Sequence, residues 1–229
     1  MMNKTKKSTA RKSIALLMML LLVLVLAAGC GGKADAQGTP SGAVEKCLQA
    51  IKDGDEAALK ECYAGDASDL TNIADTGGVS SYESMGIDEE TTKELRDKLM
   101  EFEYETGKEA VDGDQGTVDT TIRTYNVGSL LSSWFKDYMA WVTSEAMTGE
   151  YQQDELTQKG VDMFMEAFKD IKKDYKKTVE IPVEKKDGKW MVSDLSNNEE
   201  VIDALTGGAV SGAKEMLSGV SDVLGDDDE

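Results

Sequence analysis

Apolar residues follow one another without interruption near the start of the chain, and they return later with the spacing of helices and strands. The uninterrupted run covers residues 14–28, fifteen positions, after a stretch with five basic and no acidic residues. It is shorter than the roughly 20 residues that span a bilayer as a helix. A basic start followed by an apolar run of this length is typical of a secretory signal peptide.

The run ends in Leu-Ala-Ala-Gly-Cys over residues 26–30. Small residues before a cysteine resemble the lipobox of bacterial lipoproteins, in which diacylglycerol alkylates the thiol and the chain is cut before it. The resemblance implies that residues 1–29 are a signal peptide and that Cys30 holds the protein on the outer face of the cell membrane, as in Gram-positive bacteria. The alternative is an uncleaved signal anchor. Two acyl chains on one residue suffice for stable anchoring.

Residues 30–40 are small and polar and indicate a flexible tether, up to roughly 30 Å long when extended. Helical spacing begins directly afterwards, because Thr39 fits an N-cap and Pro40 the first helical position. The predicted helix ends at residues 53–55, Asp-Gly-Asp, and a second short helix completes a helical hairpin. The apolar stripe of the first helix consists of Val44, Cys47, Leu48 and Ile51.

Two later segments alternate between apolar and polar residues and predict β-hairpins over residues 101–125 and 177–195. Their turns carry Asp-Gly-Asp at 112–114 and Lys-Asp-Gly-Lys at 186–189. Pro182 lacks an N–H group for the ladder, which predicts an edge strand or a bulge there. Residues 66–87 are poorly patterned and predict a loop with at most one helical turn, before a helix up to residue 99.

Between the hairpins, apolar residues at helical spacing predict two long helices over residues 127–147 and 154–175. We therefore expect an α+β fold, with a helical hairpin and a long helix pair packed on a curved antiparallel sheet. The domain should cover residues 41–208, with the helical part 127–175 as an insertion. Residues 209–229 would form a glycine-diluted C-terminal helix and an acidic tail, which frays because its acids lie at the negative helix end.

The Thr-Pro start, the Asp-Gly-Asp break and the Asp-Gly-Lys-Trp of residues 187–190 resemble features of small extracytoplasmic lipoprotein domains. Those domains adopt the cystatin-like cone of the nuclear transport factor two superfamily, and the chain's ending is similar to domain-of-unknown-function lipoproteins of Gram-positive bacteria. The resemblance covers residues 39–208. It implies a sheet curved around helices and brings no activity with it.

Composition excludes several kinds of chemistry. The chain of 229 residues has no histidine, so Ser-His-Asp and Cys-His catalysis and zinc sites that need an imidazole are excluded. Its 44 acidic against 25 basic residues give a net charge of −19. Nucleic-acid binding requires a basic patch, so we expect no nucleic-acid partner.

The remaining chemical motifs are weak. Ser133 and Lys136 match the Ser-x-x-Lys of penicillin-recognising enzymes, but the accompanying Lys-Thr-Gly strand is missing from the chain. The acidic clusters lack the spacing of a calcium loop and are explained by solvated faces and turns. We expect no catalytic residue, no metal site and no cofactor.

Cys47 and Cys62 lie on the apolar faces of the predicted helical hairpin, at similar distances from its turn. An extracytoplasmic compartment would permit a disulfide between them. The alternative is a pair of buried thiols that act as small hydrophobic side chains. The sequence leaves both open.

The most unusual local feature is an aromatic cluster around Trp134, Tyr138 and Trp141, which occupies more than one face of its helix. It indicates either a helix packed on several sides or a surface for a small-molecule or protein partner. The favoured function is a membrane-anchored binding or interaction module. A structural envelope component without a ligand is the alternative, and an enzyme is less favoured.

We predict that replacing Cys30 by alanine releases the protein from the membrane fraction or leaves it as an uncleaved precursor, because the acyl acceptor is gone. Mass spectrometry of the processed N-terminus and fractionation of cells measure this. Cys47→Ala is the control and should leave both unchanged. Identical processing of wild type and Cys30→Ala would contradict the lipoprotein assignment.

Overall fold

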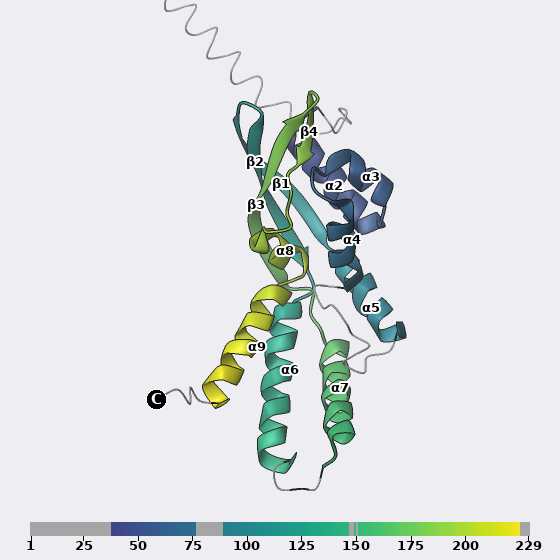
Figure 1. Cartoon of the computed structure of the whole chain (residues 1–229), viewed down its shortest axis with the longest axis vertical. Helices are drawn as coiled ribbons and strands as arrows, with labels where there is room; N and C mark the ends of the chain where they lie inside the picture. Colours follow the sequence, from purple (N-terminus) through teal and green to yellow (C-terminus); the bar gives the residue numbers. More distant parts are fainter. Residues whose placement is uncertain (1–37, 77–88, 147–148, 150, 225–229) are drawn as a thin grey trace, which may run out of the picture. The chain divides into compact units, whose positions relative to one another are not determined.

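The computed structural model describes residues 38–76, 89–146, 149 and 151–224 (Figure 1). The predicted signal peptide, Cys30, most of the tether and the acidic tail lie outside these residues. Within the described part of the chain, no helix is long and apolar enough to cross a membrane.

The structure is a mixture of helices and one antiparallel sheet. Strands β1 (Glu103–Asp112), β2 (Gln115–Thr124), β3 (Tyr175–Lys186) and β4 (Lys189–Val192) pair in the order β1-β2-β3-β4. The helices are α2 (Pro40–Asp53), α3 (Glu56–Cys62), α4 (Ala67–Thr76), α5 (Glu89–Met100), α6 (Val127–Trp141), α7 (Gln153–Lys169), α8 (Glu199–Leu205) and α9 (Ala209–Leu224), with a π-helical turn η2 (Val142–Ala146) after α6. The predicted α+β class is confirmed.

Both predicted hairpins are present; β3 as a whole is not the predicted edge strand, but Pro182 lies at a position that β4 does not pair with. β3 is an inner strand, and Pro182 pairs in register with Thr117 of β2. The proline is tolerated because β4 pairs only with residues 183–186, and Ser193, just past its end, donates its N–H to the Pro182 carbonyl at 2.9 Å. The N–H and C=O of one residue in an antiparallel strand point to the same side. The missing N–H of Pro182 therefore faces a position where β4 has already ended.

Helix α2 covers the buried face of the sheet and contacts all four strands. It begins as predicted, with the Thr39 hydroxyl accepting a hydrogen bond from the Gly42 N–H at 3.1 Å, and it ends at Gly54 in the left-handed conformation. Side chains of the main core come from α2, α3, α4, the sheet and α8. The predicted stripe Val44, Cys47, Leu48 and Ile51 is buried in it.

A second, smaller core joins α5, α6, α7 and α9 through Leu99, Val127, Leu130, Phe164, Phe168 and Ala209. The predicted helix 154–175 is too long at its C-terminal end, because α7 stops at Lys169 and Tyr175 already pairs with Thr124 in the sheet. The predicted loop after residue 66 contains a helix instead, α4. The chain between α7 and β3 forms the segment 170–174, which is important for the site below.

Glycines allow α6 and α9 to touch through their backbones. Gly207 and Gly208, both with positive φ, form the turn before α9, and the Gly128 N–H donates to the Gly207 carbonyl at 3.0 Å. A Cβ on Gly128 would overlap the Gly208 carbonyl, and one on Gly212 would lie 2.7 Å from the Gly128 carbonyl oxygen. The glycines that interrupt the apolar pattern of α9 and its preceding turn are thus required by the packing on α6. We call Gly128, Gly207, Gly208 and Gly212 the glycine crossing.

Asp203 of α8 ties the start of α9 to the sheet. Its carboxylate accepts hydrogen bonds from the Ser211 N–H at 2.8 Å and the Ser211 hydroxyl at 2.9 Å, and it lies 3.4 Å from the Lys177 ammonium of β3. Burial alone would raise the pKa of Asp203, but these partners outweigh it and hold the pKa below its ordinary value. The carboxylate therefore stabilises the fold in its ionised form.

We predict opposite effects for two glycines of α9. Gly212→Ala should lower the free energy of unfolding by about 1–3 kcal/mol, because its methyl group overpacks against α6. Gly219→Ala is the matched control, since its Cβ would meet only Phe135 at an ordinary 3.7 Å. It should raise stability by about 1 kcal/mol through helix propensity. Urea unfolding measures the free energy of unfolding of both variants. Equal changes would contradict the close backbone contact at Gly212.

Asp203→Asn should lower the free energy of unfolding by about 1.5–3 kcal/mol at pH 7, the range for hydrogen bonds to a charged group. Because the folded pKa is depressed, this contribution is present above the unfolded pKa of about 3.9 and is lost as the pH falls through the folded value. The gap between wild type and variant should thus close below about pH 4. Glu180→Gln, an exposed substitution on the other sheet face, should show little change at any pH.

Candidate functional site

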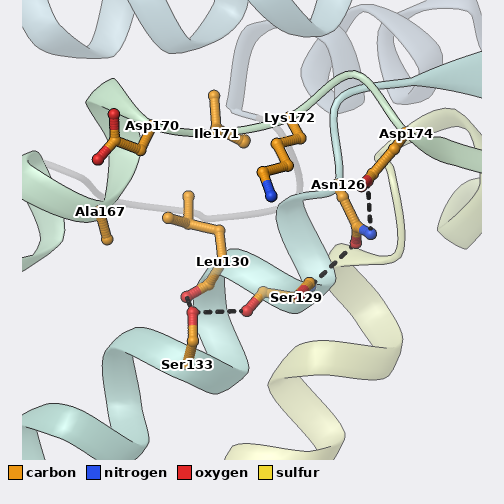
Figure 2. A pocket seen from close by; sticks show the side chains of 9 residues that line it. All are labelled: Asn126, Ser129, Leu130, Ser133, Ala167, Asp170, Ile171, Lys172 and Asp174. Carbon is orange, nitrogen blue, oxygen red and sulfur yellow. Dashed lines mark hydrogen bonds between the residues drawn. The ribbon is translucent and has the colours of Figure 1, made fainter.

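A cavity of about 350 Å³ opens between the start of α6 and the segment that joins α7 to β3 (Figure 2). Its two walls are more than thirty residues apart in the sequence, so only the folded structure creates it. Polar groups converge from both sides over a small apolar base. The lining residues are Asn126, Ser129, Leu130, Ser133, Ala167, Asp170, Ile171, Lys172 and Asp174.

Asn126 holds the two walls together. Its side-chain oxygen caps α6 by accepting the Ser129 N–H at 3.1 Å, and its side-chain N–H donates to Asp174 Oδ1 at 3.1 Å. Its backbone N–H donates to the Lys172 carbonyl at 2.9 Å. One residue thus fixes the segment 172–174 against the first turn of α6.

The base of the cavity is part of the second core. Leu130 is buried there, and Ala167 and Ile171 pack against the same cluster. These side chains offer an aliphatic surface and no aromatic ring. A ligand in the cavity would therefore meet polar groups at the rim and an aliphatic surface beneath them.

The charges around the cavity are of both signs. Figure 2 shows the Lys172 ammonium directed into the space between Leu130 and Asn126, whereas the Asp170 carboxylate points the other way. The neighbouring lysines are engaged elsewhere, Lys173 with Glu103 at 3.0 Å and Lys177 with Asp203 at 3.4 Å. Within the described residues, Lys172 has no ion pair, although Asp174 lines the same cavity.

The Ser-x-x-Lys residues are not arranged as an activated nucleophile. The Ser133 hydroxyl donates to its own helix, to the carbonyls of Ser129 at 2.8 Å and Leu130 at 3.1 Å. Lys136 is exposed. Ser133 is instead a wall residue of the cavity and presents its oxygen as a hydrogen-bond acceptor.

The structure brings the predicted aromatic residues together, but in the interface between α6 and α7. The Trp134 indole donates to the Gly160 carbonyl at 2.9 Å, and the Tyr138 hydroxyl donates to the Leu156 carbonyl at 3.3 Å. Ring contacts continue on both sides, from Phe164 against Trp134 to Tyr151 against Trp141. Trp134, Tyr138 and Trp141 are half-buried, and none of them lines the cavity.

Cys47 and Cys62 face each other between α2 and α3 as free, buried thiols. The hydrogen bond to Cys62 and burial raise the pKa of the Cys47 thiol. The Cys62 thiol donates to the Ala58 carbonyl at 3.1 Å. In this structure Cys47 and Cys62 pack as two small buried side chains, and the disulfide between them stays a prediction. In the described part of the chain, no group of three or more Cys, Asp or Glu side chains is placed to hold a metal ion.

Sequence reasoning missed the residues of the cavity. Asn126 carries a local signal, since asparagine before an apolar helix is a frequent N-cap. Asp170, Lys172 and Asp174 carry none, because the sequence pattern continued a helix through them. Their place in a cavity wall follows from the end of α7 at Lys169.

No protein-family model matches the chain, and no curated protein matches it. Among solved structures, it is similar to the crystal structure of a candidate lipoprotein, YcdA, from Bacillus subtilis. The two share 14% sequence identity with a TM-score of 0.48, and the match covers 74% of this chain and 56% of the other. This chain therefore spans about half the length of that protein.

Proposed function

We propose that this protein is a lipid-anchored extracytoplasmic binding module, which is attached to the outer face of the cell membrane through Cys30 and binds a small soluble ligand in the cavity between α6 and residues 167–174. The observation that carries the proposal is the cavity itself. Its volume falls in the range of about 300–1,000 Å³ that is usual for ligand pockets. Polar groups from two segments converge on an aliphatic base, which is also usual for such pockets.

The position of the cavity suits a tethered protein. The chain enters the fold at α2, where the Ser41 N–H donates to the Glu109 carboxylate at 2.9 Å, close to the turn between β1 and β2. Asn126 lies just beyond the opposite end of β2, a ten-residue strand. Glu109 pairs with Val118, six residues before the end of β2, so at about 3.3 Å per residue the two points are roughly 20 Å apart. The cavity thus lies away from the place where the described chain enters the fold.

The proposal assigns binding and no catalysis. A serine nucleophile needs a base that accepts its proton, and the Ser133 proton is directed to backbone carbonyls of α6. The contacts of the aromatic cluster agree with the first of its two interpretations, a helix packed on several sides. The cluster packs α7 on α6 and so holds the wall that carries Ala167 and Ile171.

Filling the cavity with a large side chain tests whether ligands bind there. In Ser133→Trp, a bulky ring enters the cavity from an exposed position on α6, and Lys136→Trp adds the same ring on the same helix outside the cavity. Saturation-transfer NMR with amino acids, short peptides, sugars and small organic acids should find compounds that bind wild type and Lys136→Trp. Those signals should disappear with Ser133→Trp, while circular dichroism shows all three proteins folded.

Two outcomes would contradict the proposal. One is that no compound class binds wild type. The other is that Ser133→Trp binds the same compounds as wild type, which would place binding elsewhere. The first result would favour a structural envelope component without a ligand, and the second would favour a binding site elsewhere on the protein.

A further inference from the structure

We infer that the cavity selects a small aliphatic zwitterion, a molecule with a carboxylate that pairs with Lys172 and an ammonium group that pairs with Asp174; this rests on the proposed function. A free amino acid with an aliphatic side chain is the simplest member of this class. The inference begins from two opposite charges that line one cavity without pairing with each other.

Lys172 is the group that would receive the carboxylate. Its ammonium is directed into the cavity, and within the described chain it forms no ion pair, unlike Lys173 and Lys177. The exposed hydroxyl of Ser129 lies on the facing wall and can add a second donor. A charged hydrogen bond of this kind is stronger than a neutral one.

The first turn of α6 cannot take this role. Its N–H groups are already used, Val127 toward Tyr125, Gly128 toward Gly207 and Ser129 toward Asn126. A helix N-terminus binds anions only through N–H groups that lack partners. Among the lining groups, Lys172 is therefore the one cationic donor for a ligand anion.

Asp174 is the group that would receive the ammonium. The hydrogen bond from Asn126 to Oδ1 fixes its carboxylate, so that the second oxygen, Oδ2, is available without a loss of side-chain freedom on binding. Asn126 is itself fixed by its cap on Ser129. The Asp174 carboxylate is thus held in place by Asn126, which is held in turn by the backbone N–H of Ser129.

The presence of Lys172 and Asp174 in one cavity discriminates against ligands that carry a single charge. A plain carboxylate would meet the negative charge of Asp174, and a plain amine would meet the positive charge of Lys172. A zwitterion satisfies both signs at once, which is selection by repulsion as well as attraction. The aliphatic base of Leu130, Ala167 and Ile171 fits a hydrocarbon side chain, and the lining has no ring for stacking.

Three probes of the same hydrocarbon shape separate these contributions in isothermal titration calorimetry. They are L-leucine, 4-methylpentanoate, which lacks the ammonium, and 3-methylbutylamine, which lacks the carboxylate. L-leucine should bind wild type at least tenfold more tightly than either of the others. Lys172→Gln should weaken L-leucine at least tenfold and leave the amine unweakened. Asp174→Asn, which can keep the Asn126 bond, should weaken L-leucine and not the carboxylate.

Lys176→Gln is the control, because this exposed lysine is near in sequence but does not line the cavity, and it should bind like wild type. The inference is overturned if either one-charge probe binds as tightly as L-leucine, if Lys172→Gln has no effect, or if none of the three probes binds. In each case the proposed function still stands when another compound of the NMR series binds in a way that Ser133→Trp abolishes. If no compound does so, the proposed function fails as well.

Discussion

The backbone contact between α6 and the turn that precedes α9 is the constraint on which the rest of the structure depends. Only glycine fits at Gly128 and Gly212, because any side chain there would enter the backbone of the neighbouring segment. The contact continues along the two helices, where the Ser132 hydroxyl donates to Glu215 at 2.6 Å. α6 therefore starts at a fixed position beside the end of β2, and Figure 1 shows α9 lying along it.

That fixed start determines where the cavity forms. Asn126 lies directly before α6, so its three hydrogen bonds hold residues 172–174 at a defined distance from Ser129. On the other side, the aromatic rings and the second core attach α7 to α6 and place Ala167 and Ile171. The site thus results from two contacts of α6. Glycine residues make the contact with α9 and its preceding turn, and aromatic rings make the contact with α7. Asp203 completes the support, because it links the first turn of α9 to β3.

The elements that the sequence predicts well are those determined by neighbouring residues. Thr39, Pro40 and Gly54 are local start and stop signals, and both hairpins follow from alternation around a turn with glycine. The errors occur where distant contacts decide. Apolar spacing extended α7 to residue 175 because nothing local shows that Tyr175 pairs with Thr124. The glycines of α9 looked like weak helix formers because the carbonyls they approach are more than eighty residues away. For the same reason, the sequence drew attention to Trp134, and the cavity lies around Asn126 and Lys172.

The backbone contact between α6 and α9 is tested most directly by NMR on protein with isotope-labelled glycine, through the distance between Gly128 and Gly212. If α6 and α9 touch through their backbones, Hα protons of Gly128 and Gly212 should give a strong nuclear Overhauser effect to each other, since no side chain separates them. The effect should persist when a ligand fills the cavity, because the crossing supports the site and does not belong to it. Well-resolved glycine signals without this cross-peak would contradict the account, since α6 would then have no fixed start and the cavity no fixed wall.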